Sequence, residues 1–487
     1  MVFPIVGGDG KPTGYEIDNS LRFNDDDSAR LTLDPGTSTN NKKCTLSFWA
    51  KIGVPTSNGT DYIFSNHSDG NNRVRVHISN TGEFAIFGKS SGSTFIDLYT
   101  NAKYRDPSAW YHFLVRVDST DGTANNRLKL YVNGTLQTDV TQGTNPDQNA
   151  DVILGSQDNM TIGAGHSGSA ANSNPYDGYL AEMHFLDGTA YDASYFGEFD
   201  DNNVWIPKKY TGGNYGTNGF YMEFKQTGTS QNSSGIGADT SGNDNHFAVT
   251  NLSALEVTED TPTNNFATLN PLFRSNFDND GSYSEGNVQI SFTADNAKRG
   301  YGFSTFGVTS GKWYWEVLVS TVARANTGIG DINAIAGYTG PIYDENPSKG
   351  FIVNYNGQIE ENATATSYAN SLSNGDTVMW ALDMDNHRAY YGINGTWQDS
   401  GDPTSGSTGT GDVTTQISDQ SHLNTGEPMF PFCLDASTSG ESNFKWNFGN
   451  PFHTINSGNN DGKYGNFEYA PPSGYYALCT KRLAEFD

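Results

Sequence analysis

The chain has 487 residues, with 35% hydrophobic and 13% aromatic side chains, and a formal net charge of −27. A prior of roughly 150 residues per domain predicts two to four domains. The acidic balance argues against DNA, RNA or anionic membranes as partners, because phosphate binding requires clustered Lys and Arg. Without an apolar stretch near the ~20 residues of a membrane helix, we also expect no membrane insertion.

Alternating apolar and polar residues predict β-strands along the first 200 residues. In the segment 43–52, every second side chain from Cys44 onward is apolar. The strand at 178–186 is expected to close this part, with Leu180, Met183 and Phe185 in the core. Further strands are expected at 15–23, 29–33, 62–65, 73–79, 83–87, 95–99, 110–118, 127–132, 151–154 and 160–162.

Two segments far apart share one hairpin pattern. Residues 110–135 and 377–397 each contain an aromatic strand, a polar turn and a return strand that ends in Asn-Gly-Thr. The Asn-Gly dipeptide suits the positive φ angles of a tight turn. We interpret the two copies as parts of separate β-sandwiches and not as a short-period repeat.

The second half of the chain shows the same strand signals. Between the halves, residues 261–271 form a Pro- and Asn-rich boundary. We predict an all-β protein with two antiparallel β-sandwich (jelly-roll) domains at 1–199 and 273–487, joined by an ordered irregular connector at 200–272 that can lend strands to a neighbouring sheet. Strands of the second domain are expected at 287–292, 299–306, 311–317, 328–330, 351–355, 378–384, 388–393, 429–434 and 442–448.

Several segments carry family resemblances. DNSLRF, CTLSFWAKI, WYHFLVRVD, LKLYVNGT, TIGAG and GYLAEMHFLDGTAYD follow one another as in a laminin-G-like, concanavalin A-type lectin domain. This resemblance covers about 15–199 and implies a two-sheet jelly roll. GKWYWEV, GDTVMWALDMDNHRAYYGINGTW, MFPFCL and FKWNFG resemble a SPRY domain, a bent β-sandwich used for protein recognition, over about 273–478.

The connector resembles a region of bacteriophage structural proteins in which a laminin-G-like domain runs into similar motifs. The matching segments are VWIPKKYTGGNYGTNGFYMEF, DTSGNDNHF and DTPTNNFATLNP, with one extra residue between Tyr210 and Tyr215. The resemblance implies a non-enzymatic structural or adhesion component of a phage particle: a tail fibre, capsid fibre or surface appendage. Its expected location is the virion, after assembly in the host cytoplasm without a signal peptide. Expected partners are other virion proteins, further copies of itself (for example a trimer), and a host-surface glycan or protein.

No motif predicts catalysis. The chain lacks a Glu-x-Asp-x-x-Glu strand, a Gly-x-Ser-x-Gly elbow and a phosphate loop. Glu182 lies beside His184 in a predicted strand, where we expect an outward polar face on a half-buried strand. A glycan-processing enzyme is the alternative and requires paired carboxylates in a cleft. A soluble bacterial lectin outside any virus is the third interpretation.

Binding residues are easier to nominate. Sugar sites combine an aromatic face with polar hydrogen-bonding groups. Trp397 lies just past a turn, and Tyr210 and Tyr215 lie in a Gly-rich loop, so these three are candidate ligand contacts. For each of them, ordinary packing is the alternative.

The acidity of the chain has two interpretations. One is solubility, and the other is divalent-cation binding. Asp25, Asp26 and Asp27 are the candidate calcium ligands, although no EF-hand spacing is present. No other cofactor is expected. The three cysteines are predicted to be buried free thiols.

Overall fold

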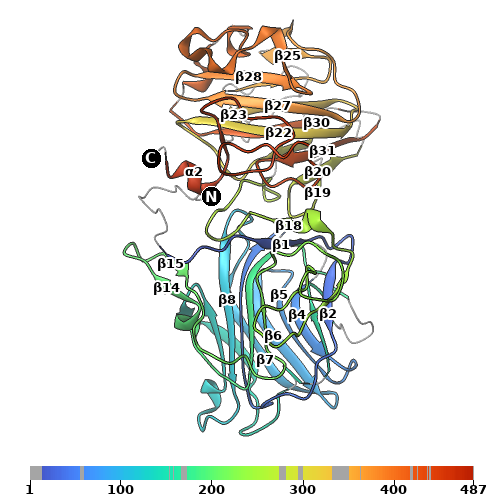
Figure 1. Ribbon diagram of the computed structural model, residues 1–487, viewed down its shortest axis with the longest axis vertical. Helices are drawn as coiled ribbons and strands as arrows, with labels where there is room; N and C mark the ends of the chain where they lie inside the picture. Colours follow the sequence, from blue (N-terminus) through green and yellow to red (C-terminus); the bar gives the residue numbers. More distant parts are fainter. Residues whose placement is uncertain are drawn as a thin grey trace. The chain divides into compact units, whose positions relative to one another are not determined.

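The computed structural model describes residues 14–54, 60–152, 154–156, 158–165, 173–273, 281–293, 300–331, 350–361, 364–416, 420–424, 426–435, 437 and 440–485. They form two compact units, Pro12–Asn265 and Phe266–Asp487, coloured blue to green and green to red in Figure 1. Both are built mainly from antiparallel strands. The predicted all-β class with two β-sandwiches is therefore confirmed. Among the described residues, no helix is long and apolar enough to cross a membrane.

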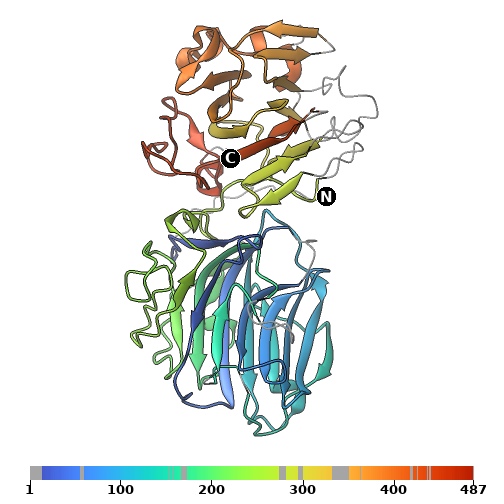
Figure 2. The same cartoon turned by 90° about the vertical axis from the view of Figure 1, so that its right-hand side faces the viewer.

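The first unit packs two eight-stranded sheets face to face (Figure 2). Sheet A has the order β10-β9-β8-β3-β13-β1-β18, with β16 also paired to β13. Sheet B has the order β11-β7-β6-β5-β4-β12-β2-β17. The strands of sheet A are β1 (Ser20–Phe23), β3 (Lys43–Ile52), β8 (Trp110–Asp118), β9 (Leu128–Val132), β10 (Thr135–Leu136), β13 (Gly178–Asp187), β16 (Phe220–Met222) and β18 (Val257–Thr258). Those of sheet B are β2 (Arg30–Leu33), β4 (Asp61–His67), β5 (Arg73–Ile78), β6 (Glu83–Ser90), β7 (Ser93–Lys103), β11 (Val140–Thr144), β12 (Asn159–Ile162) and β17 (Ala248–Thr250).

The core of the first unit lies between these sheets. Phe113 of sheet A packs against Phe84 of sheet B with ring centroids 4.4 Å apart. Leu180, Met183 and Phe185 are fully buried in the same cluster, so their predicted core positions are confirmed. Burial of large apolar side chains on both inner faces is the main stabilising contribution to such a sandwich.

Most of the segment expected to be a connector, residues 200–265, is part of the first unit. Its strand β16 pairs with β13, β17 with β2, and β18 with β1. The hairpin of β14 (Gly197–Phe199) and β15 (Trp205–Pro207) is a separate two-stranded sheet. A second aromatic cluster packs on the outward face of sheet A, so that β13 is buried along its whole length. The cluster contains Leu114, Tyr131, Leu186, Tyr191, Ala193, Phe196, Trp205, Tyr210, Tyr215 and Tyr221.

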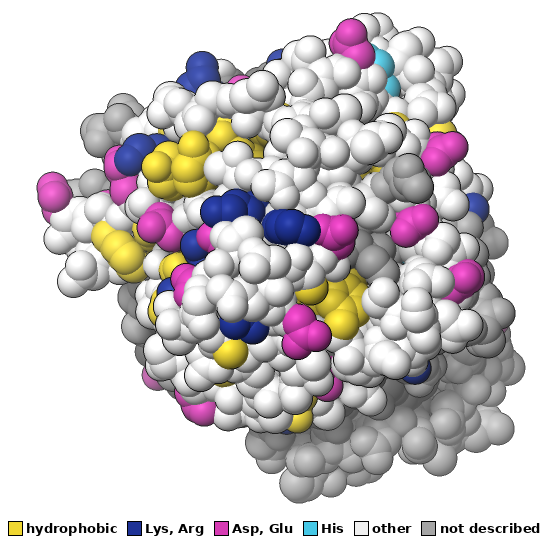
Figure 3. All heavy atoms as spheres, turned by 90° about the horizontal axis from the view of Figure 1, so that it is seen from below, with side chains coloured by type: hydrophobic (Ala, Val, Ile, Leu, Met, Phe, Trp, Pro, Cys, Tyr) yellow, Lys and Arg dark blue, Asp and Glu magenta, His cyan; other side chains and the backbone are white. Residues whose placement is uncertain are grey.

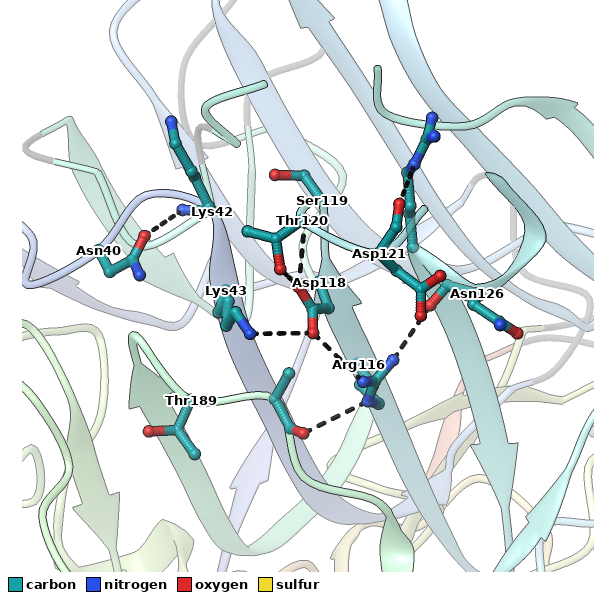
Figure 4. Close-up of polar contacts among 12 residues, drawn as sticks. Asn40, Lys42, Lys43, Arg116, Asp118, Ser119, Thr120, Asp121, Asn126 and Thr189 are labelled. Carbon is teal, nitrogen blue, oxygen red and sulfur yellow. Dashed lines mark hydrogen bonds and ion pairs between the residues drawn. The ribbon is translucent and has the colours of Figure 1, made fainter. Parts of the chain in front are cut away.

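Basic side chains near one end of sheet A are paired with carboxylates. Figure 4 shows Lys43 and Arg116 converging on Asp118, at 3.2 and 3.5 Å. Lys42 pairs with Asp151 at 2.5 Å. On the molecular face in Figure 3, Lys and Arg side chains likewise lie among Asp and Glu side chains. The positive charges at these places are therefore locally balanced.

The second unit also has two sheets. Their orders are β19-β20-β31-β22-β27-β28-β29, with β32 parallel to β22, and β21-β30-β23-β24-β25-β26. The strands of the first are β19 (Ser282–Ser284), β20 (Gln289–Phe292), β22 (Lys312–Thr321), β27 (Asp376–Asp383), β28 (Arg388–Ile393), β29 (Thr396–Trp397), β31 (Ser442–Asn447) and β32 (Tyr476–Ala477). Those of the second are β21 (Gly300–Phe303), β23 (Ala325–Asp331), β24 (Gly350–Val353), β25 (Gln358–Glu361), β26 (Thr364–Ser367) and β30 (Met429–Asp435).

In the described part of the chain, helical structure is limited to short pieces. The α-helix α2 spans Thr480–Leu483. Short 3₁₀ turns occur at Ala124–Asn126, Ala193–Tyr195, Ala254–Glu256, Gln398–Ser400, Pro403–Thr408, Thr414–Gln416 and Gln420–Leu423. All three cysteines are buried and free, as the sequence predicted.

Both predicted hairpins use their Asn-Gly turn in the same way. Asn133 and Asn394 have φ of 45° and 49°, and the glycine after each also has positive φ, as a type I′ turn requires. Each Asn side chain accepts a backbone hydrogen bond from the opposite strand, from the His112 or Thr377 N–H, at 2.8 Å. The Asn thus supplies both the turn conformation and an acceptor that fixes the register.

A buried tryptophan links the two sheets of the second unit. Trp380 of β27 donates from Nε1 to the Thr327 hydroxyl of β23 at 3.0 Å. It also packs on Trp315 and Tyr391, with ring centroids 6.3 and 5.1 Å away. The aromatic strand that the sequence singled out is therefore the centre of this core.

Candidate functional site

A pocket of about 620 Å³ lies on the outward face of sheet A, in the first unit. We call it the Glu182 pocket. It is formed by four stretches of chain: the segment before β1, strand β13, the Gly-rich loop before β16, and β16 with the residues that follow it. Its lining consists of Tyr15, Glu16, Ile17, Asp18, Asn19, Glu182, His184, Lys209, Tyr210, Thr211, Gly213, Tyr215, Tyr221, Glu223, Lys225, Thr240 and Ser241.

A β-bulge in β13 sets the direction of Glu182. The register pairs Ala181 with Trp49 and His184 with Ser47, so Glu182 and Met183 together face only Phe48. Met183 enters the core, while Glu182 has a φ of 49°. That left-handed conformation costs a non-glycine residue roughly 1–2 kcal/mol. The bulge therefore directs a carboxylate outward at a position where simple alternation would not place one.

Two tyrosine hydroxyls donate to the Glu182 carboxylate. Tyr15 donates to Oε1 at 2.7 Å and Tyr221 donates to Oε2 at 2.8 Å. The two phenol oxygens lie 3.0 Å apart. Burial, followed by the Glu182 charge, raises the pKa of both phenols. Both hydroxyls therefore keep their protons, and the carboxylate receives a charge-assisted hydrogen bond on each oxygen.

His184 lies beside Glu182 at the base of the pocket. Its Nδ1 is hydrogen-bonded to the Tyr215 hydroxyl at 2.8 Å, and its Nε2 lies 3.7 Å from Glu182 Oε1. Its ring stacks on Tyr221 with centroids 4.3 Å apart. The Glu182 and His184 side chains are only 8% and 3% exposed. These contacts lock the rotamers of the residues that line the pocket.

The rim carries opposite charges. Glu223 pairs with Lys225 at 2.6 Å. Lys209, Glu16 and Asp18 are exposed. Taken together, the lining contains four carboxylates and two ammonium groups. The pocket is therefore negative on balance, with aromatic walls and a carboxylate–phenol cluster at its base.

Of the three ligand contacts nominated from sequence, the structure brings two together. Tyr210 and Tyr215 both line the Glu182 pocket. Tyr210 stacks on Phe196 at 5.3 Å. Trp397 lies in the second unit, where it is half-buried and packs edge-on against Tyr314 at 6.4 Å. It does not contribute to this pocket.

The expected environment of Glu182 and His184 is wrong in one respect. Both point outward from the core, but β13 is fully buried and not half-buried, because the aromatic cluster described above covers this face of the sheet. Sequence reasoning also missed Tyr15 and Tyr221. The alternation in Phe220–Met222, with the tyrosine between two buried apolar residues, is a signal that could have identified Tyr221.

Asp25, Asp26 and Asp27 lie in the turn after β1. Asn24 donates to Asp27 Oδ2 at 3.1 Å, and Asn251 donates to the Asp27 carbonyl at 2.7 Å. Burial and the neighbouring Asp26 raise the pKa of Asp25. Among the described residues, no three His, Cys, Asp or Glu side chains are grouped so as to hold a metal ion. The calcium site stays a prediction.

Residues 24–194 match the model of the concanavalin A-like lectin/glucanases superfamily. This part of the chain is similar to that superfamily. The lectin-type resemblance is thus confirmed over most of the first unit. No curated protein matches the chain.

Similar solved structures cover parts of the chain. A native heptameric SAP-like pentraxin from Limulus polyphemus is 16% identical, covers 37% of this chain and 80% of its own, and has a TM-score of 0.28. The SPRY domain of human HERC1 is 17% identical, with 32% and 86% covered and a TM-score of 0.21. A putative carbohydrate binding protein from Bacteroides ovatus is 12% identical, with 48% and 58% covered and a TM-score of 0.32.

Proposed function

We propose that this protein is a glycan-binding adhesion protein whose ligand enters the Glu182 pocket. The observation that carries the proposal is the lining, in which four tyrosines converge with a carboxylate on an open space of about 620 Å³. Sugar sites combine flat aromatic faces with a few oriented hydrogen-bonding groups. The similarity of residues 24–194 to the concanavalin A-like lectin/glucanases superfamily supports the same function.

The test is binding by the full chain to a panel of oligosaccharides. Tyr221→Ala removes a pocket wall and should weaken binding by at least about tenfold, since a lost stacking and hydrogen-bonding group exceeds ~1.4 kcal/mol. The matched control is Tyr99→Ala, because Tyr99 is an exposed tyrosine of sheet B in the same unit. The control should bind as wild type. Equal losses in both variants, or no binding by the wild type, would remove the proposal.

The proposed setting is a bacteriophage particle. The supporting observation is that the phage-like segment 204–224 supplies Tyr210, Tyr215 and Tyr221 to the pocket. The protein would be a tail fibre, capsid fibre or surface appendage, assembled with other virion proteins and with copies of itself, such as a trimer. Its SPRY-like part, about 273–478, would offer a second surface for a host protein.

Two observations test this setting. Mass spectrometry of purified virions should detect the chain, and its absence from the particle would exclude a virion component. Neighbouring portal, capsid and tail genes are expected. A gene outside such a cluster would favour a soluble bacterial lectin.

Glycan processing is the second candidate, because Glu182 and Glu223 both line the pocket. We favour binding without cleavage, since both Glu182 oxygens already accept phenol hydrogen bonds and Glu223 pairs with Lys225. Retaining glycosidases need two carboxylates roughly 5 Å apart that act on the substrate. Incubation with host-envelope polysaccharide should release no reducing ends. Release that Glu182→Gln abolishes would establish an enzyme instead.

A further inference from the structure

We propose that the Glu182 pocket selects neutral sugars and rejects sugars that carry a carboxylate, and that Glu182 sets this preference. This inference rests on the proposed glycan-binding function and names the class of its ligand. It follows from the hydrogen bonds that the hydroxyl protons of Tyr15 and Tyr221 make, and from the charged side chains that line the pocket.

The hydroxyl protons of Tyr15 and Tyr221 already form hydrogen bonds within the protein. A tyrosine hydroxyl has one proton to donate and two lone pairs to accept with. Tyr15 and Tyr221 each donate that proton to a different oxygen of Glu182. No proton is left for the 3.0 Å contact between the two phenol oxygens. Toward a ligand, this pair therefore offers acceptor lone pairs and no donor.

A ligand at this pair must therefore supply the proton of the hydrogen bond. A sugar hydroxyl can donate to Tyr15 or Tyr221, since it has both a proton and lone pairs. A carboxylate can only accept, so it leaves the acceptor pair without a partner.

The charge distribution points the same way. The lining contains the carboxylates of Glu16, Asp18, Glu182 and Glu223 and the ammonium groups of Lys209 and Lys225. The Lys225 ammonium is neutralised by Glu223 at 2.6 Å. Lys209 is the remaining cation of the lining, and it is exposed, where water and salt screen it. A uronic or sialic acid carboxylate near the base would face the buried charge of Glu182.

The hydrogen bonds of the two phenols to Glu182 depend on the β-bulge at that residue. Glu182 reaches the two phenols from a backbone with φ of 49°, a conformation that is sparsely populated and retained where surrounding contacts hold it. Tyr15 lies 167 residues and Tyr221 lies 39 residues away in the chain, and both hydroxyls meet at this carboxylate. Replacing Glu by Gln keeps its shape but changes which atoms donate.

Glu182→Gln is therefore the decisive variant. The Gln amide N–H₂ donates to one phenol oxygen, which frees the proton of that phenol for a ligand and removes the negative charge. Binding of the full chain is measured against matched oligosaccharides that end in glucose or in glucuronic acid. Wild type should prefer the neutral sugar by about tenfold, the equivalent of ~1.4 kcal/mol. In Glu182→Gln this preference should fall to near unity.

The control is Glu198→Gln, which removes the same charge outside the pocket. Glu198 is 55% exposed and pairs with Lys208 at 3.5 Å. The Glu198→Gln variant should prefer the neutral sugar as strongly as wild type does. If Glu182→Gln does not fold by its melting curve, Tyr15→Phe serves instead: it deletes one acceptor and should lower neutral-sugar affinity several-fold while acidic sugars stay rejected.

The outcomes separate the two proposals. Wild-type preference for the acidic sugar, or equal binding of both, overturns the selectivity and leaves glycan binding intact. An unchanged preference in Glu182→Gln overturns the role of Glu182. Binding of neither sugar class by wild type removes the proposed function itself.

Discussion

His184 and Tyr221 face each other across the β13–β16 pair, with their rings 4.3 Å apart and only 8° from parallel. One belongs to β13, the closing strand of the lectin-like sandwich, and the other to β16, in the segment that follows that sandwich in the sequence. This stack attaches that segment to the sandwich at the residue pair that also forms the base of the Glu182 pocket. Binding site and attachment point therefore share the same side chains.

The Tyr221 hydroxyl should contribute to stability as well as to binding. Tyr221→Phe leaves one oxygen of the buried Glu182 without its phenol donor. The expected loss is about 1–3 kcal/mol of the free energy of unfolding, measured by urea denaturation. Tyr210→Phe is the matched control, because its hydroxyl makes no hydrogen bond in the described residues. A control variant that loses as much as Tyr221→Phe would contradict this account.

Breaking the ion pair of Lys51 and Asp260 should destabilise the first unit more than loss of the Tyr221 hydroxyl does. The two side chains are 1% and 0% exposed and lie 2.8 Å apart, and Trp110 Nε1 also donates to Asp260 at 3.0 Å. Burial lowers the pKa of Lys51. Asp260→Ala leaves the cation buried without its counter-charge and should cost about 3–5 kcal/mol.

A double variant distinguishes the interaction between the two charges from the interactions of each charge with its surroundings. Lys51→Met with Asp260→Ala should recover part of that loss, because no buried charge remains. The free energies of all four proteins are compared in one denaturation cycle. Additive losses would show that the two charges do not interact.

The buried His112 should make the free energy of unfolding depend on pH in the acidic range. Burial, with a smaller effect of His184, lowers its pKa from 6.5 to about 3. Between these values the unfolded chain binds a proton that the folded chain does not, so stability rises with pH through this window. Its contribution is complete above pH ~6.5 and is lost as pH falls toward ~3.

The slope of stability against pH measures this effect. His112→Gln keeps a polar atom for the 2.8 Å contact with Ser47 but does not titrate. Its unfolding free energy between pH 4 and 6 should have a slope smaller than wild type by about 1.4 kcal/mol per pH unit. Parallel curves for the two proteins would exclude His112 as the titrating group.

Asn394 should stabilise the central hairpin of the second unit in two separable ways. It has a φ of 49° and accepts from the Thr377 N–H at 2.8 Å. Asn394→Gly keeps the backbone conformation but loses the acceptor, which should lower the free energy of unfolding by about 1 kcal/mol. Asn394→Ala also adds the cost of a left-handed conformation, so the free energy of unfolding should fall by about 2–3 kcal/mol in total. Thermal melts of both variants test this order, and an Ala variant at least as stable as Gly would contradict it.

The calcium prediction has a direct test. If Asp25, Asp26 and Asp27 bind the ion, chelator should lower the melting temperature and added Ca²⁺ should restore it, because a ligand of the folded state stabilises by mass action. Asp26→Asn should abolish the difference. A melt that is unchanged by chelator would count against the site.

The sequence by itself determined most of the strands and the two Asn-Gly turns. The strand expected at 151–154 is not formed at the described residues 151, 152 and 154, and β11 was not predicted. The apolar side chains of the closing strand indicated Leu180, Met183 and Phe185 as core residues, and the Asn-Gly dipeptides marked both hairpins, because these signals act over a few neighbouring residues. It also identified Tyr210 and Tyr215 as candidates, although it grouped Trp397 with them.

Only the tertiary structure decided which sheet face is covered and which side chains meet there. Alternation distinguishes the two faces of a strand but does not say what lies over the outer one. Tyr15 and Tyr221 are 206 residues apart, and they meet Glu182 because the segment after β13 folds back over sheet A. Such a contact depends on packing between distant segments, which no local pattern of residues encodes.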